Sequence, residues 1–343
     1  MKSYFLPVTK IALVLVYLVI IAGAMVRMTG SGMGCPDWPK CFGYYIPPTN
    51  EAELLFTPNK TYNKGMVIIK DETLFVAKST FTTTQNYNKE NWIQYTKHDY
   101  AVFNPFHTWV EYINRLFGAL AGLACVASFA LAFWHWKANK KLLLFSFAIC
   151  VLMGFQAWLG KTVVDSVLSP VKITTHMLVA FLIVALQLYL IFYFTRLKNN
   201  LTLKVNSTFN KVMLFALTLT IIQVVLGTGV REFIDHISKT NLPKEFWLNE
   251  PTVLFYIHRS FSILVILTTA FLVYKNYTLN LKYGKIKAIL LIILLEILSG
   301  IAMANFAFPF GTQTIHLVLS ALLFGFQFYL LLEIYFNNKR ELV

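Results

Sequence analysis

Charged residues are scarce in this chain of 343 residues. Asp, Glu, Lys and Arg together make up 13% of it, whereas 57% of the residues are hydrophobic. An ordinary soluble domain carries about 25% charged residues, so the composition excludes that class. We expect an all-α integral membrane protein surrounded by membrane lipid.

Acidic residues are the scarcest charged type: 16 Asp and Glu stand against 30 Lys and Arg, which gives a formal net charge of +14. A nucleic-acid-binding protein would gather its basic residues on one face, but here they lie between apolar runs. We therefore expect no nucleic-acid partner. No small-residue cleavage site clearly follows the first apolar segment, so we expect that segment to stay as a helix.

Only four cysteines are present. Cys125 and Cys150 lie inside apolar runs, where packing is the expected role. Cys35 and Cys41 flank a loop rich in Gly, Pro and Asp, and they form either a disulfide or a redox-active thiol pair. An oxidising compartment favours the disulfide. A Cys-only metal site lacks a second cysteine pair.

Long apolar runs dominate the rest of the chain. A membrane-spanning helix needs about 20 mostly apolar residues. Eight segments meet this requirement, over residues 10–27, 108–133, 142–160, 173–195, 210–230, 252–274, 286–304 and 314–336.

Basic residues gather in every second connection between these segments, and acidic residues are almost absent there. The positive-inside rule places such segments on the cytoplasmic side. We therefore expect both termini in the cytoplasm of a bacterial-type inner membrane, with the long loop 28–107 on the opposite side. The basic residues are Lys2, Lys10, Lys137, Lys140, Lys141, Arg196, Lys198, Lys204, Lys211, Lys275, Lys282, Lys285, Lys287, Lys339 and Arg340.

An internal repeat relates the two halves of the chain. The run 112–117 resembles 256–261, and 174–176 resembles 314–316. Val26-Arg27 likewise resembles Val230-Arg231, and Gln156 with Gly160 aligns with Glu296 and Gly300. Each copy has an even number of spans, so both insert in the same orientation. We expect two four-helix bundles, within residues 1–200 and 201–343, related by a pseudo-two-fold axis along the membrane normal.

Three of the seven histidines stand at the outer ends of apolar segments, where a polar group usually serves a function. His258 and His316 are at matching depth in the second half. Facing histidines in a four-helix bundle can hold a heme, and no carboxylate or thiolate is obvious nearby to complete a zinc site. His176 is the third. We expect His98, His135 and His236 to be surface or interface residues.

The first half differs at the position that matches His258, where it has Asn114. Glu111 is on the same helix face as Asn114, while the matching residue in the second half is Phe255. A carboxylate in a membrane span is a functional candidate, and a salt bridge with Arg115 is its structural alternative. His107 also falls on this face if the helix extends that far; otherwise it only ends the loop.

Four arginines fall at outer helix ends: Arg27, Arg115, Arg231 and Arg259. Each is either an anchor for the anionic propionates of a heme or an ordinary interface residue.

These motifs together resemble the heme A synthase family. The resemblance rests on the run from Thr29 to Cys41 with its Cys-Pro-Asp-Trp-Pro core, on Glu111-x-x-Asn114-Arg115, on His258-Arg259, and on His176 and His316. It extends over all eight spans.

The resemblance implies oxidation of the methyl group at pyrrole carbon eight of heme O to a formyl group, giving heme A for a terminal oxidase. It implies a heme b held by His258 and His316, a substrate heme at His176, a catalytic Glu111 and an outer disulfide between Cys35 and Cys41. Heme O synthase, the terminal oxidase and a second copy of the chain are the partners considered.

Asn114 departs from the family, which usually has the second substrate-site histidine there. Either His107 replaces that ligand, or His176 alone holds the substrate iron. Two rival functions remain: a non-catalytic b-type cytochrome, and a heme-handling transporter or chaperone. Both predict heme binding without conversion of heme O.

Overall fold

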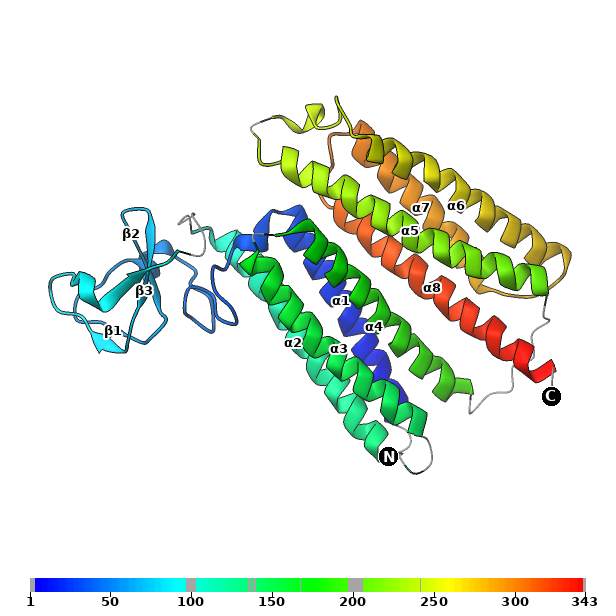
Figure 1. Cartoon of the computed structure of the whole chain (residues 1–343), viewed down its shortest axis with the longest axis horizontal. Coiled ribbons are helices and arrows are strands. Elements are labelled where there is room, and N and C mark those ends of the chain that lie inside the picture. Colours follow the sequence, from blue (N-terminus) through cyan, green and yellow to red (C-terminus); the bar gives the residue numbers. More distant parts are fainter. Residues whose placement is uncertain are drawn as a thin grey trace.

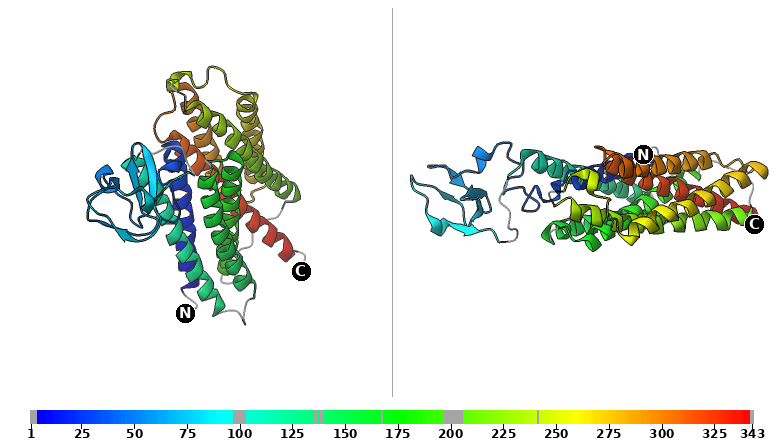
Figure 2. Two further views of the ribbon diagram at one scale, coloured as in Figure 1. Left: turned by 60° about the vertical axis from the view of Figure 1, so that its left-hand side comes forward. Right: turned by 90° about the horizontal axis from the view of Figure 1, so that it is seen from above.

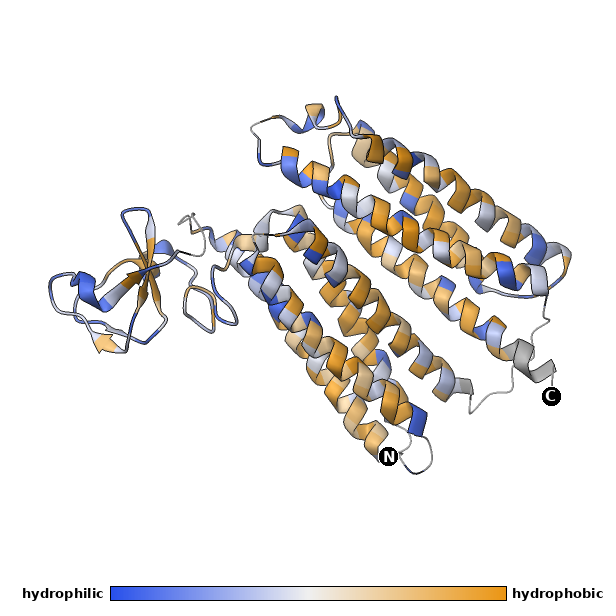
Figure 3. Cartoon of the chain, viewed as in Figure 1, coloured by the Kyte–Doolittle hydropathy of each residue, from blue (hydrophilic) through white to orange (hydrophobic). Residues whose placement is uncertain are grey.

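A computed structural model of the chain describes residues 4–96, 103–134, 137, 140–166, 168–196, 206–240 and 242–341. Eight helices within these residues are long and apolar enough to cross a membrane. Apolar residues cover most of their length (Figure 3). The helices are α1 Phe5–Met28, α2 Pro105–Phe133, α3 Lys140–Asp165, α4 Pro170–Arg196, α5 Ser207–Ile237, α6 Val253–Thr278, α7 Lys285–Asn305 and α8 Thr312–Glu341. The protein is therefore an all-α integral membrane protein, as the composition predicts.

Each predicted span coincides with one helix, and the main error lies at the end of α5. The sequence predicts a loop from Arg231, but α5 continues to Ile237. Arg231 and Asp235 form an ion pair one turn apart, with 2.6 Å between Nη2 and Oδ1, which stabilises this polar last stretch. His236 is consequently a helical residue and not a loop residue.

The helices form two bundles, α1–α4 and α5–α8, which lie side by side (Figure 1). One apolar core lies within α5–α8. The other is centred on α1–α4 and extends to residues of α5 and α8, namely Leu217, Val224, Ala321 and Phe324. The bundles meet mainly through α4 and α8, where the rings of Phe181 and Phe324 stack with 4.8 Å between centroids. The hydroxyl of Tyr17 in α1 also donates to the carbonyl of Ala321 in α8 over 3.3 Å.

Asparagines begin two of the helices. The side chain of Asn104 accepts hydrogen bonds from the backbone N–H groups of Phe106 and His107, and Pro105 occupies the first helical position of α2. Asn206 accepts from Phe209 at the start of α5. Both satisfy N–H groups that have no partner inside the helix. The cap at Asn104 extends α2 far enough outward to include His107.

The long outer loop contains a small β unit that the sequence analysis did not predict. Its strands are β1 Thr61–Tyr62, β2 Val67–Lys70, β3 Thr73–Ala77, β4 Phe81–Thr82 and β5 Trp92–Gln94. β1 pairs with β4, and β3 lies between β2 and β5, all antiparallel. Asp71 and Glu72 both have positive φ angles and make the two-residue turn between β2 and β3.

The β unit lies beyond one end of the helices, whereas α1 begins and α8 ends at the other end (Figures 1 and 2). The described part of the outer loop is thus at the opposite end of the bundles from the start of α1 and the end of α8. Five residues named in the sequence analysis lie outside the described residues, namely Lys2, His98, His135, Lys198 and Lys204.

Candidate functional site

A cavity of about 2000 Å³ opens between the helices of the first half and the outer end of α5. Five glycines along its wall leave the space that larger side chains would fill: Gly23, Gly118, Gly122, Gly154 and Gly160. The cavity brings together most of the first-half residues singled out from the sequence, namely Arg27, His107, Glu111, Asn114, Arg115 and His176, and it also contacts Arg231. His258 and His316 do not line it.

Glu111 lies on the wall of this cavity and is only 3% exposed. Its Oε1 pairs with Nη2 of Arg115 at 2.5 Å, and its Oε2 accepts a hydrogen bond from the backbone N–H of Cys35 at 2.9 Å. The ion pair considered from the sequence is therefore present. It does not exclude a chemical role, because the carboxylate also borders the cavity.

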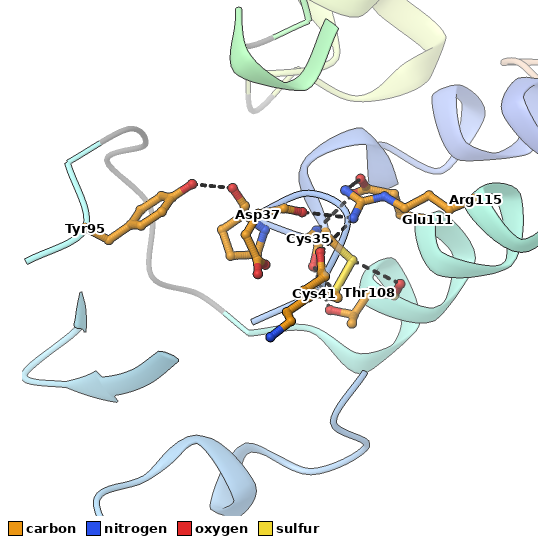
Figure 4. A network of polar contacts seen from close by, with 10 residues as sticks. Cys35, Asp37, Cys41, Tyr95, Thr108, Glu111 and Arg115 are labelled. Atoms are coloured by element: carbon orange, nitrogen blue, oxygen red, sulfur yellow. Dashed lines mark hydrogen bonds and ion pairs between the residues drawn. A yellow bond between two sulfur atoms is a disulfide. The ribbon is translucent and has the colours of Figure 1, made fainter. Parts of the chain in front are cut away.

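Cys35 and Cys41 form a disulfide, and we refer to residues 35–41 as the disulfide loop. The loop is docked on α2 by Arg115, whose Nη1 donates to the carbonyls of Asp37 and Lys40 at 2.9 and 2.8 Å (Figure 4). Just before the loop, Gly34 packs so closely on the backbone of His107 that a Cβ atom would overlap it. The disulfide loop thus covers the outer end of α2 beside Glu111.

Asp37 anchors the disulfide loop from within. Its Oδ2 accepts from the backbone N–H of Gly43 at 2.8 Å. Burial raises the pKa of Asp37 above its usual value, although this hydrogen bond and the charge of Arg115 oppose the shift. The hydroxyl of Tyr95 donates to the carbonyl of Pro36. Burial and the nearby charge of Asp37 raise the pKa of Tyr95 to about 12.

Asn114 and His176 line the same cavity, and each has a buried polar atom that no described residue contacts through a hydrogen bond. These atoms are Oδ1 of Asn114 and Nδ1 of His176. A glycine on a neighbouring helix is next to each: a Cβ on Gly23 would lie 3.7 Å from Oδ1 of Asn114, and one on Gly160 would lie 3.6 Å from Cε1 of His176. The amide of Gln156 donates to the carbonyl of His176 at 2.9 Å.

In the second half His258 and His316 face one another, with 6.3 Å between ring centroids. Two metal–nitrogen bonds of about 2 Å, with about 1 Å from each nitrogen to its ring centre, place the centroids of two ligating imidazoles about 6 Å apart. The observed separation therefore fits one iron between the rings. Gly227 leaves room for His258, and Gly300 leaves room for His316.

This site contains a carboxylate that was not expected from the sequence. Oε2 of Glu296 lies 2.7 Å from Nδ1 of His316, and the hydroxyl of Ser299 lies 2.8 Å from the same nitrogen. The statement that no carboxylate is near the second-half histidines is therefore wrong. The alignment of Glu296 with Gln156 in the repeat was the available signal. Among the described residues no cluster of three or more His, Cys, Asp or Glu is arranged to hold a metal ion.

His107 is held at the outer part of the cavity. Its Nδ1 lies 2.8 Å from the hydroxyl of Ser31, which is fully buried and lies 2.6 Å from the hydroxyl of Thr29. The α2 helix does extend through His107, so His107, Glu111 and Asn114 follow one face of it.

Arg27 and Arg231, the repeat-related arginines, converge on one carboxylate that the sequence analysis did not single out. Arg27 lies 2.8 Å and Arg231 2.6 Å from the oxygens of Asp235. Nη2 of Arg231 also donates to the carbonyl of Arg27 at 3.0 Å. The three side chains link the two bundles at the edge of the cavity. Arg259 instead lies over the ring of Tyr256, 5.9 Å from its centroid.

Eight apolar helices in two related bundles, a glycine-walled cavity and a pair of facing histidines define an integral membrane protein with sites suited to heme. The chain belongs to the family described as cytochrome oxidase assembly protein, COX15-CtaA, whose model matches residues 8–81 and 64–328.

Several relatives carry the name heme A synthase. The one from Shewanella oneidensis is 31% identical over 181 residues, which is 53% of this chain and 43% of the relative. The one from the Wolbachia of Brugia malayi is 22% identical over 91% of both chains. The one from Ehrlichia canis is 24% identical over 92% of this chain and 89% of the relative.

Proposed function

We propose that this chain is a membrane oxidoreductase that converts the C8 methyl group of heme O into a formyl group, making heme A for a terminal oxidase. The observation that carries the proposal is the cavity that joins Glu111, Asn114 and His176. Its volume of about 2000 Å³ exceeds the range of about 300–1,000 Å³ that is usual for small-molecule pockets, as a porphyrin with a long isoprenoid tail requires. Family membership and relatives named heme A synthase support the same reaction.

The substrate heme belongs in the first half, within residues 1–200. His176 supplies an imidazole to its iron, and the glycine wall leaves room for its plane. Glu111 is the carboxylate placed to accept a proton released when the methyl group is oxidised, and Arg115 holds it in position. The disulfide loop covers this end of the cavity and limits access of water.

A resident heme b belongs in the second half, within residues 201–343, between His258 and His316. The 6.3 Å separation of the two rings supports this assignment. When bound, this heme supplies reversible one-electron transfer. Glu296 and Ser299 fix the ring orientation of His316 through Nδ1, which leaves Nε2 for the iron.

Arginines at the outer edge are suited to the propionates of these hemes. Arg27 and Arg231 border the cavity, and both form ion pairs with Asp235. The two positive charges exceed the single negative charge of Asp235, which leaves a net positive charge for a propionate. Arg115 donates to Glu111 and to two backbone carbonyls, so its role is to hold the disulfide loop. Arg259 remains a candidate anchor for the second half.

The placement of the β unit opposite the chain ends supports an orientation with both termini in the cytoplasm and the disulfide loop outside. Heme O synthase is the partner that would supply the substrate, and the terminal oxidase is the partner that would receive the product. A homo-oligomer is the remaining partner hypothesis.

Co-expression of the chain with a heme O source, followed by heme extraction and chromatography, tests the function. Heme A should appear with the wild-type chain. The Glu111→Gln variant should lower its yield by about 10²- to 10⁴-fold, the usual contribution of a general acid or base. Accumulation of heme O alone, with heme still bound to the protein, would identify a b-type cytochrome or a heme carrier instead.

A further inference from the structure

The two halves provide an internal comparison of ligand positions. Asn114 in α2 corresponds to His258 in α6. The glycines next to these two residues, Gly23 and Gly227, also correspond in the repeat. Each glycine lies one helical turn before a repeat-related arginine, Arg27 or Arg231. A Cβ on Gly227 would lie 3.1 Å from Cε1 of His258, and one on Gly23 would lie 3.7 Å from Oδ1 of Asn114. Asn114 thus occupies the packing environment of a heme-ligating histidine.

Asn114 cannot ligate heme iron as an imidazole at this position would. The axial ligands of heme iron are imidazole, thiolate, thioether or phenolate groups, and a neutral amide is not among them. Oδ1 of Asn114 is nevertheless buried and has no hydrogen-bond partner among the residues that the structure describes. A buried polar atom without a hydrogen-bond partner is unfavourable in a residue that only packs against its neighbours, but it is expected at a site that binds a small ligand.

His107 cannot take the place of the missing imidazole. It lies seven residues closer to the outer end of α2, and seven helical residues rise about 10 Å. Its Nδ1 is within 2.8 Å of the hydroxyl of Ser31, which is itself buried. His107 therefore remains at the outer part of the cavity, with Glu111 between it and Asn114.

Five sulfur-bearing side chains line the cavity, and two of them, Cys150 and Met153, lie too far inward to reach the iron beside His176. Both lie on α3, seven or more residues inward of Gly160, which is level with His176. This separation again corresponds to about 10 Å or more. Neither side chain is therefore level with His176.

We propose that the substrate heme of this chain is held through His176 alone, and that the opposite face of its iron is open beside Asn114 to a small ligand such as imidazole or cyanide. The amide group of Asn114 borders that open position. This inference rests on the proposed substrate site in the first half.

Titration of the purified full-length chain with hemin tests the ligand state by absorption and electron paramagnetic resonance spectroscopy. The difference between the wild-type chain and the His176→Ala variant isolates the first-half heme. That heme should be high-spin in the wild type, and it should stay high-spin in the Asn114→Ala and His107→Ala variants. Asn114→His should convert it to the low-spin form, because an imidazole then occupies each side.

Added imidazole gives a second readout. It should bind the first-half heme of the wild type and convert it to the low-spin form. In Asn114→His the internal imidazole competes at an effective concentration of about millimolar or more, so the affinity for added imidazole should fall by about tenfold or more.

The outcomes separate this inference from the proposed function. A first-half heme that is low-spin in the wild type overturns the single-ligand arrangement, and its conversion to high-spin in His107→Ala would identify His107 as the second ligand. Equal hemin binding by the wild type and His176→Ala would instead remove the substrate site, and with it the basis of the proposed function in the first half.

Discussion

The backbone N–H of Cys35 donates a hydrogen bond to Oε2 of Glu111 over 2.9 Å, which joins the disulfide loop to a carboxylate inside a membrane-spanning helix. Arg115 completes the link, because it contacts the same carboxylate and two carbonyls of the loop. The position of Glu111 therefore depends on the closure of the loop outside the helix bundle.

Replacing both cysteines tests this dependence. The Cys35→Ser/Cys41→Ser variant should lose the fixed hydrogen bond to Glu111, a loss of about 1–3 kcal/mol that corresponds to about 5- to 150-fold. Heme A yield per protein should fall by this factor, whereas the absorbance of the second-half heme should be unchanged. Cys125→Ser is the matched control, since a hydroxyl can still accept from Gln187. A fully active double variant would contradict the dependence.

The buried pair of Glu111 and Arg115 should behave as a unit. Removing either partner of a buried ion pair destabilises a protein by about 3–5 kcal/mol, because the other charge is left unpaired. Arg115→Ala and Glu111→Gln should therefore be coupled, and the double variant should lose less stability than the two single variants combined. Thermal unfolding in detergent measures the stability of the two single variants and of the double variant.

An exposed pair of the same spacing provides the control. Lys161 and Asp165 are 4.0 Å apart, and their side chains are 44% and 41% exposed. Lys161→Ala should change stability by about 1 kcal/mol or less. Simple additivity of the Arg115 and Glu111 variants would show that the buried pair is not coupled.

The sequence predicts the membrane part well because hydrophobic length determines it. Every predicted span coincides with a helix, and the helices form the two bundles α1–α4 and α5–α8. The repeat also singles out Asn114, because its counterpart in the second half is His258 and this difference is visible in the sequence. Hydrophobic length and repeated motifs can be read from the sequence without knowing which distant segments contact one another.

Contacts between distant segments explain what the sequence analysis missed. The pairing of Arg27 with Asp235 connects α1 to α5 and becomes visible only when the bundles meet. The strands of the β unit contain five residues or fewer, too short for a clear alternating pattern. Glu296 approaches His316 only because α7 packs against α8.

Alkaline pH should loosen the disulfide loop through Tyr95. Its pKa is raised from 10.0 to about 12 by burial and by the charge of Asp37, so the folded state favours the protonated phenol. The contribution of Tyr95 to stability is fully present below pH 10 and is lost as the pH rises toward 12. Limited proteolysis of the outer loop should accelerate over this range.

The Tyr95→Phe variant serves as the comparison for this pH effect. It lacks the hydroxyl that donates to Pro36 and also lacks the titrating group. Its proteolysis should be faster than that of the wild type at neutral pH and should change less between pH 10 and 12. An equal increase in both proteins would assign the alkaline loosening to another group.

Glu296 should tune the heme proposed for the second half through His316. A carboxylate on the outer nitrogen of a ligating imidazole increases its basicity and fixes its orientation, and its removal lowers metal affinity by about 10- to 100-fold. The Glu296→Gln variant should therefore release heme more readily. A less basic ligand favours the reduced iron, so the reduction potential should also rise.

The repeat supplies the matched control for the Glu296→Gln variant. Gln156 occupies the position of Glu296 in the first half, and its side-chain amide donates a hydrogen bond to the backbone carbonyl of His176. Gln156→Ala should leave the potential and retention of the second-half heme unchanged, as measured by redox titration of the absorbance. If Glu296→Gln behaved in the same way, Ser299 alone would be sufficient to hold Nδ1 of His316, because it lies 2.8 Å from that atom.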